Sequence, residues 1–113
     1  MYRADIEDII ASNGETLVLR SGDGFVGVRG LMQRLGSRRI AGVGWDVSLM
    51  PEDADYAAMF FAAQPGFVPE IGDTITDSRD ALWRIDQTLP VIMDGELTGW
   101  RVLCRGRQRT GGR

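Results

Sequence analysis

The chain has 113 residues, enough for one domain with one hydrophobic core. Its 13 basic and 16 acidic residues leave a net charge of −3, which argues against a surface that binds DNA regardless of sequence. It has no His and one Cys, Cys104, so the commonest general base, an intramolecular disulfide and a cysteine-based zinc site are excluded.

A short amphipathic helix is predicted within residues 1–13, because Ile6, Ile9 and Ile10 are spaced three and four apart. A helix this short is not stable alone, so we expect it to dock on its own domain or on a neighbouring subunit. Charges are mixed through Met1–Asp8, which argues against a signal peptide. No window approaches the ~18 apolar residues of a membrane span, so we expect a soluble protein in a reducing compartment.

Two antiparallel strands are predicted next. Thr16, Val18 and Arg20 alternate with Leu17 and Leu19, and a Ser-Gly-Asp-Gly loop separates this strand from Phe25–Leu31. Gly27 and Gly30 inside the second strand indicate a bulge or a sharply coiled strand.

A projecting arm is predicted at about Met32–Pro51, as a long hairpin or a mobile loop, because this stretch is Gly-rich and without clear periodicity. Arg34, Arg38 and Arg39 are candidate interface residues, for acidic patches on a neighbouring subunit or for DNA phosphates. A solvated loop explains them equally well. Trp45 favours the interface, because Trp and Arg are enriched at binding hot spots.

The second half predicts further strands. We prefer a strand to a helix at Asp55–Ala63, because the run is short and its flanks are rich in turn formers. Strands are also expected at Thr74–Thr76, Ala81–Gln87 and Leu97–Arg105. Pro90 and an Asp-Gly pair punctuate the segment between the last two.

The final residues, 105–113, predict a loose basic tail, in which Arg105, Arg107 and Arg109 are further candidate interface residues. All 13 basic residues of the chain are Arg. This favours bidentate binding of carboxylates or phosphates, or it reflects the codon usage of a GC-rich genome.

The predicted fold is mostly β: a small antiparallel β-barrel or sandwich with a short N-terminal helix and a long projecting loop or hairpin. It forms one domain over residues 1–113, with the barrel in residues 15–104.

No catalytic, cofactor or metal site is expected. The glycine-rich loops lack the Lys-Ser/Thr and the βαβ setting of a phosphate-binding loop. Carboxylates such as Asp77 and Asp80 lie in predicted turns, where Asp is common for its own hydrogen bonding. Cys104 has no His to activate it and is expected to be a small buried hydrophobe.

The segment PEIGDTITDSRDALWRIDQTLPVIMDGELTGWRVLCRGR resembles the C-terminal half of tailed-phage head–tail connector proteins. Its pattern is a Gly-Asp turn, a short strand, a turn, a strand of aromatic and aliphatic residues, and a final strand ending in basic residues. Upstream, VGVRGLMQRL and DYAAMFFAA resemble the family strands on either side of a long flexible hairpin. The resemblance covers roughly residues 15–107 and departs from the pattern at TLPVIMDGELTGW, a longer connection than expected.

The closest likeness is to lambda-type head–tail joining proteins, also called head-completion or stopper proteins. It implies a non-catalytic virion protein at the phage neck, assembled in the host cytoplasm. Copies would form a six-fold or twelve-fold ring around the DNA channel, between the portal or adaptor and the tail terminator or tail tube. Packaged DNA could be contacted non-specifically, and no membrane is involved.

Three alternatives stay open. One is another neck or tail component, such as a tail-completion protein. A second is an OB-like binder of single-stranded nucleic acid, which would need exposed aromatic residues on a basic groove. A third is an enzyme, which would have to depend on carboxylates or on a cofactor.

Overall fold

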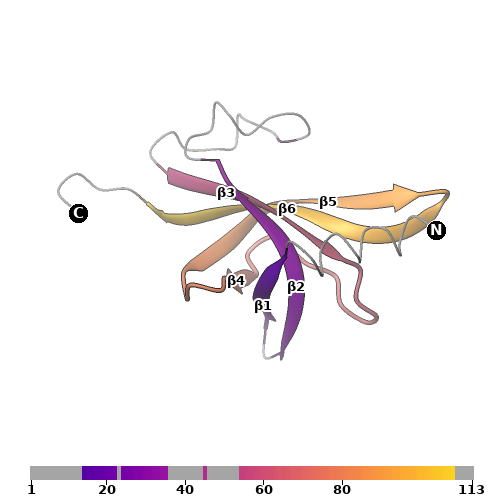
Figure 1. The fold of residues 1–113 in the computed structure, drawn as a ribbon, viewed down its shortest axis with the longest axis horizontal. Coiled ribbons are helices and arrows are strands. Elements are labelled where there is room, and N and C mark those ends of the chain that lie inside the picture. Colours follow the sequence, from indigo (N-terminus) through magenta and orange to yellow (C-terminus); the bar gives the residue numbers. More distant parts are fainter. Residues whose placement is uncertain (1–13, 23, 36–44, 46–53, 109–113) are drawn as a thin grey trace.

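The computed structural model describes residues 14–22, 24–35, 45 and 54–108. These residues form six strands: β1 (Glu15–Ser21), β2 (Gly24–Arg34), β3 (Ala54–Ala62), β4 (Thr74–Thr76), β5 (Leu82–Met93) and β6 (Glu96–Gln108). The strands close into a barrel in the order β1-β2-β3-β6-β5-β4 (Figure 1). The predicted antiparallel β fold is thus confirmed as a barrel rather than a sandwich.

The barrel consists of two antiparallel meanders of three strands each. β1, β2 and β3 pair in sequence, and so do β4, β5 and β6. Antiparallel pairing of β1 with β4 and of β3 with β6 joins the meanders on both sides. Closure removes the exposed strand edges that an open sheet would present.

The barrel is filled by side chains from alternate positions of its strands. In β1, Leu17 and Leu19 are fully buried, whereas the intervening Val18 is only partly buried. The interior cluster also takes in buried residues of every other strand: Val28, Ala57, Met59, Phe61, Ile75, Trp83, Ile85, Val102 and Cys104. Such alternation is what a strand with one face in the core requires.

A second, smaller cluster lies on the outer face of the barrel. Leu35, Trp45, Tyr56 and Leu103 are buried there, and Ala58 and Leu89 pack against them. The aromatic residue of the predicted arm therefore packs on the outer side of β3 and β6.

The β5–β6 hairpin extends beyond the barrel as a ribbon (Figure 1). The register with β3 ends at Gly99 of β6, and the register with β4 ends at Arg84 of β5. Asp94 and Gly95 form the turn with φ values of 52° and 77°, and two positive φ angles are typical of a tight type I′ hairpin turn. The long connection that departs from the family pattern is this hairpin.

Several sequence predictions can now be compared with the fold. The strand at residues 55–63 is confirmed. The prediction that Pro90 punctuates the chain was wrong, because β5 continues through it. The ladder between β1 and β2 has no register shift, so Gly27 and Gly30 mark no bulge in it.

Two boundaries also differ from the predictions. Residues 32–34 pair with β3, so the connection to β3 begins later than expected. β6 runs to Gln108, so the first residues of the predicted tail belong to a strand. The predicted helix at residues 1–13, most of the arm and residues 109–113 lie outside the described residues.

Candidate functional site

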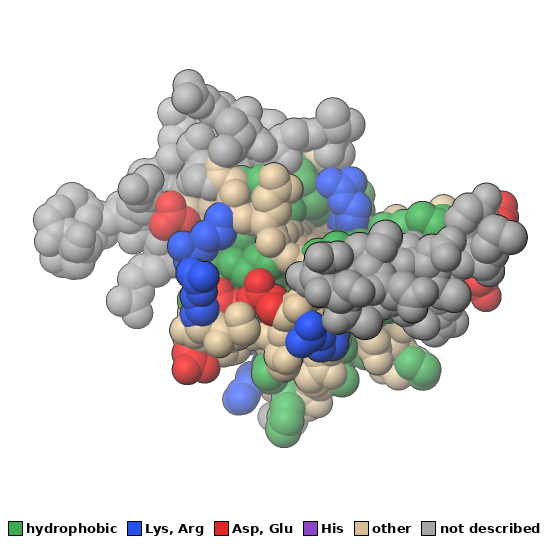
Figure 2. Space-filling view, viewed as in Figure 1, with side chains coloured by type: hydrophobic (Ala, Val, Ile, Leu, Met, Phe, Trp, Pro, Cys, Tyr) green, Lys and Arg blue, Asp and Glu red, His purple; other side chains and the backbone are tan. Residues whose placement is uncertain are grey.

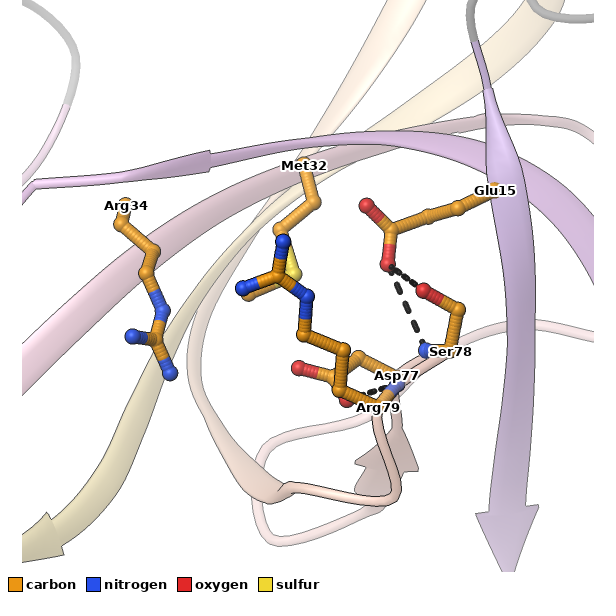
Figure 3. A pocket seen from close by; sticks show the side chains of 6 residues that line it. All are labelled: Glu15, Met32, Arg34, Asp77, Ser78 and Arg79. Atoms are coloured by element: carbon orange, nitrogen blue, oxygen red, sulfur yellow. Dashed lines mark hydrogen bonds between the residues drawn. The ribbon is translucent and has the colours of Figure 1, made fainter.

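One open end of the barrel, here called the mouth, holds a polar hollow of about 230 Å³ (Figure 3). It is lined by Glu15, Met32, Arg34, Asp77, Ser78 and Arg79. Glu15 begins β1 and Arg34 ends β2, while Asp77, Ser78 and Arg79 belong to the turn between β4 and β5. The mouth therefore brings together segments that are more than sixty positions apart in the sequence.

Asp77 organises the turn at the mouth. Its Oδ1 accepts hydrogen bonds from the backbone N–H groups of Arg79 and Ala81, both at 2.9 Å. Its Oδ2 accepts a hydrogen bond from the indole Nε1 of Trp83 at 3.1 Å. A carboxylate with three such donors is well compensated for the loss of water, which explains why Asp77 can be 94 % buried, with 6 % exposed.

Two opposing influences set the pKa of Asp77. Burial raises it, but the hydrogen bond from Trp83 acts in the opposite direction. The two backbone N–H groups and the charge of Arg34 add to that lowering, so the pKa of Asp77 lies below its ordinary value. The carboxyl is therefore ionised at neutral pH.

Arg34 is the one predicted arm arginine that the described residues include. It is the last residue of β2, and its guanidinium lies over the ring of Trp83, 5.4 Å from the ring centroid. This is the geometry of a cation–π contact. Arg34 was predicted near the start of the projecting arm, and the structure places it at the end of β2, paired with Ala57 of β3, with its side chain directed to the mouth of its own barrel (Figure 3).

The turn is also tied to β1. The Ser78 hydroxyl donates a hydrogen bond to Oε1 of Glu15 at 2.7 Å, and the Ser78 backbone N–H reaches the same oxygen at 3.3 Å. Two arginines and two carboxylates thus line one hollow, and both carboxylates already accept hydrogen bonds.

Trp45, a candidate interface residue, is buried within its own chain. It is 6 % exposed and packs within its own chain against Tyr56 and Leu103, and the guanidinium of Arg101 lies 5.3 Å from its ring centroid. The N–H of Leu35 donates a hydrogen bond to the carbonyl of Tyr56 at 2.9 Å, which closes the base of the connection between β2 and β3. Trp45 therefore fixes the midpoint of that connection to the barrel.

Arg105 lies on the outer face of β6, directly opposite Tyr56 of β3. It stands directly opposite Arg84 in the β5–β6 register, and its Nε lies 3.1 Å from Oδ2 of Asp86. Burial raises the pKa of Asp86, whereas the charges of Arg105 and Arg84 lower it, and burial is the stronger influence. Asp86 therefore interacts with both arginines, and more strongly with Arg105.

The remaining candidates cannot be placed in a site. Arg107 lies in β6, but its side chain is outside the described part of the chain. Arg38, Arg39 and Arg109 also fall outside it. Among the described candidates, Arg34 lies at the mouth, while Trp45 and Arg105 lie on the outer face of β3 and β6.

Sequence reasoning missed the hydrogen bond between Trp83 and Asp77. The Asp-Ser-Arg-Asp turn was recognised, and the side-chain hydrogen bond of Asp77 to its own turn follows from that composition. The bond from Trp83 carries no sequence signal, because it depends on how the turn folds back over the barrel mouth.

Comparison with known proteins gives no relative: no protein-family model, no curated protein and no solved structure matches this chain. Within residues 14–22, 24–35, 45 and 54–108, no helix is long and apolar enough to cross a membrane. The same residues contain no group of three or more carboxylate, Cys or His side chains that could hold a metal ion.

Proposed function

We propose that the chain is a structural, non-catalytic subunit of the neck of a tailed phage. Copies of it form a ring that joins the portal or adaptor of the head to the tail and surrounds the DNA channel. The primary basis is the resemblance of residues 15–107 to lambda-type head–tail joining proteins. Its location would be the virion neck, after assembly in the host cytoplasm.

The observation that carries the proposal is the order of elements in the second half of the chain. A turn with Gly72 at φ 97° leads into β4, a second turn leads into β5 with Trp83 and Ile85 buried, and β6 ends among basic residues. This is the order that the resemblance implies. It supports the family assignment more than the barrel alone does, because small barrels serve many functions.

The packed interior bears on how DNA would pass. Side chains such as Phe61, Met59 and Trp83 fill the barrel, so no strand of DNA fits through a single subunit. A DNA channel must therefore lie between subunits, at the centre of a ring. In the proposed neck, each barrel is a block in the wall of that ring.

The position of the gene gives the first test. We expect neighbouring genes to encode a portal, a capsid protein and a tail tube, and we expect purified particles to contain this chain at the head–tail junction in electron micrographs. Absence of the chain from mature particles would overturn the neck assignment. Its location elsewhere in the tail would support a tail-completion role instead.

A second test addresses the connection between β2 and β3. Deletion of residues 36–44 should leave the barrel folded, as measured by circular dichroism, and should abolish incorporation into particles. A matched control replaces the exposed Val68 with Ser, which should not affect incorporation. Normal incorporation of the deletion variant would refute the role of this connection, while salt-sensitive binding of the purified protein to oligonucleotides would favour the OB-like alternative.

A further inference from the structure

The barrel is closed by two junctions between its meanders, and these junctions differ in length. We propose that the barrel opens at the shorter junction, between β1 and β4, while the longer one, between β3 and β6, stays paired and acts as the hinge. The shorter junction is here called the seam. Opening at the seam is a property of the single subunit, so it goes beyond the proposed function and does not rest on it.

The seam is a short ladder of backbone pairs. Its directly opposite residues are Val18 and Thr76, Leu19 and Ile75, and Arg20 and Thr74. The other junction is longer, because residues 54–62 of β3 lie along residues 99–108 of β6. The N–H of Ala63 extends it further with a hydrogen bond to the carbonyl of Thr98 at 3.1 Å. Since backbone hydrogen bonds hold neighbouring strands together, the seam is the weaker of the two junctions.

On its other side, β1 is held by a longer ladder. It pairs with β2 along its whole length, from Glu15 opposite Gly30 to Ser21 opposite Gly24. When the seam opens, β1 therefore stays with its own meander.

On its other side, β4 is held to β5. Its three residues pair with residues 82–84, and backbone hydrogen bonds continue the pairing beyond both ends of β4. The N–H of Gly72 donates to the carbonyl of Ile85 at 2.9 Å, and the N–H of Asp77 donates to the carbonyl of Ala81 at 3.0 Å. The Asp77 carboxylate is also bonded to Trp83 of β5. When the seam opens, β4 therefore moves with β5.

The sequence on both sides of β4 limits the length of the seam. Gly72 has a φ of 97°, a conformation that favours glycine, and it places a turn just before β4. After Thr76, Oδ1 of Asp77 accepts hydrogen bonds from the N–H groups of Arg79 and Ala81, which forms the turn to β5. A longer β4 would have to break one of these turns, so the short seam is built into the sequence.

Apolar packing inside the barrel keeps the seam closed for most of the time. Leu19 and Ile75 lie directly opposite each other across the seam, and both are fully buried. Opening exposes these side chains to water, and the cost of that exposure sets how rarely the seam opens.

Polar contacts add a smaller contribution at the surface. The Ser78 hydroxyl and its backbone N–H donate hydrogen bonds to Oε1 of Glu15, where the seam meets the mouth, and both bonds are exposed. Figure 2 shows acidic (red) and basic (blue) side chains gathered around β1 and β4 on this face of the molecule. Water competes for such exposed groups, so these contacts add little to the closed state.

The open state is a partly unfolded form of the barrel and not the unfolded chain. Both meanders and the β3–β6 junction are kept, so much less surface is exposed than in global unfolding. Its free energy therefore lies below that of global unfolding, as in other sub-global openings. While the seam is open, β1 and β4 each present an unpaired edge to which a further strand can add.

Hydrogen exchange of the purified protein, followed by NMR, tests the seam directly. The backbone N–H groups of alternate residues in a ladder point to opposite neighbouring strands. Within residues 18–20 and 74–76, the N–H groups that point across the seam should exchange at least about tenfold faster than those of residues 57–61 that point to β6. Equal exchange in the two groups, at the rate set by global unfolding, would overturn the proposal.

A disulfide across the seam provides a second test. Val18→Cys with Thr76→Cys joins two directly opposite residues of the seam, whereas Val18→Cys with Gly27→Cys joins β1 to β2 and is the control. A Cβ on Gly27 meets nothing within 4 Å, and the native Cys104 is fully buried. Oxidation of the seam pair should slow the exchange of the seam amides at least about tenfold, and oxidation of the control pair should leave it unchanged.

Two results of the disulfide test would contradict the proposal. One is unchanged exchange in the seam pair when mass spectrometry shows that the disulfide has formed. The other is equal slowing by both disulfides, which would show a general stabilisation of the barrel. The comparison of amides in the native chain gives its result whether or not the cysteine variants fold.

Removal of the Glu15 carboxylate tests the outer end of the seam. Glu15→Ala loses both bonds from Ser78, so the seam amides should exchange about two- to fivefold faster, with the amides of the β3–β6 junction unchanged. Glu70→Ala, at an exposed residue of the connection between β3 and β4, is the control and should change neither group. An equal increase at both junctions in Glu15→Ala would place the effect on global unfolding and would count against opening at the seam.

Discussion

The indole Nε1 of Trp83 donates a hydrogen bond to Oδ2 of Asp77 at 3.1 Å, across the turn that joins β4 to β5. The bond satisfies both groups. Without it, the buried indole N–H would have no acceptor, and the carboxylate would lose one of its three donors. The guanidinium of Arg34 covers the same indole. This relationship couples the barrel core to the polar mouth.

Removal of the Asp77 carboxylate should destabilise the barrel. Asp77→Ala leaves the Trp83 indole N–H and two backbone N–H groups without their acceptor, so we expect a loss of about 2–3 kcal/mol in the free energy of unfolding. Urea denaturation measures it. Asp80→Ala, in the same turn, is the control, although Asp80 has a φ of 65° that makes a small loss expected there too. Equal losses in the two variants would contradict the role of Asp77.

The same carboxylate should make stability depend on pH. Its pKa in the folded protein is lowered, so its stabilising contribution is present above the unfolded value of about 3.9 and is lost as the pH falls through the lower folded value. The difference in unfolding free energy between the native chain and Asp77→Asn should therefore be constant above about pH 5 and should narrow below about pH 4. A difference that widened on acidification would reverse the sign of the assigned shift.

Gly30 and Gly27 of β2 provide a matched pair. A Cβ on Gly30 would lie 2.6 Å from Cδ1 of Leu17 and 2.9 Å from the carbonyl oxygen of Phe60, whereas a Cβ on Gly27 meets nothing within 4 Å. Gly30→Ala should cost about 1–3 kcal/mol through overpacking. Gly27→Ala should be neutral or slightly stabilising. Thermal denaturation of both variants tests this, and a similar melting temperature for the two would show that β2 can shift outward at no cost.

Trp45 should contribute to stability through its ring and not through its N–H. The Nε1 is buried and has no hydrogen-bond partner, while the ring packs on Tyr56 and Leu103. Trp45→Ala should therefore cost about 3 kcal/mol, as large-to-small changes at buried sites do. Trp45→Phe keeps most of the packing and should cost less than about 1.5 kcal/mol. If Trp45→Ala unfolded at the same urea concentration as the native chain, Trp45 would not hold the connection to the barrel.

Cys104 should be unreactive in the folded protein. Its thiol is fully buried, and burial together with the nearby charge of Asp86 raises its pKa above the usual value. A thiol reagent such as 5,5′-dithiobis(2-nitrobenzoic acid) should titrate no Cys in native buffer and one Cys per chain in denaturant. Rapid reaction of the native chain would show that β3 and β6 open readily around this residue.

Local patterns in the sequence were sufficient to predict that the strands exist. They were insufficient to predict where the strands begin and end. Alternation placed Leu17 and Leu19 in the core, and turn formers marked both ends of β4. Alternation in β6 correctly puts Val102 and Cys104 on the interior face, but it does not show that Leu103 is also buried, on the outer face beneath Trp45. That cover comes from a segment almost sixty positions away, which periodicity within one strand cannot reveal.

The surroundings of the candidate interface residues were the least predictable part. Composition could select arginines, but it could not show that Arg34 lies over Trp83 or that Arg84 and Arg105 stand opposite each other. Both facts follow from strand register, which is decided by the closure of the whole barrel. The sequence also did not predict that β5 and β6 extend as a ribbon to the turn at Asp94 and Gly95, because Pro90 was expected to end the strand.

Pro90 has a further consequence for the exposed edge of β5. Beyond Arg84, β5 has β6 as its only neighbouring strand among those described, so this length of β5 is an edge on which another chain could add a strand. Proline has no N–H to donate, and it occurs in natural sheets at such edges. Pro90 therefore protects this edge of the ribbon from the amyloid-like strand addition that an uninterrupted edge would invite.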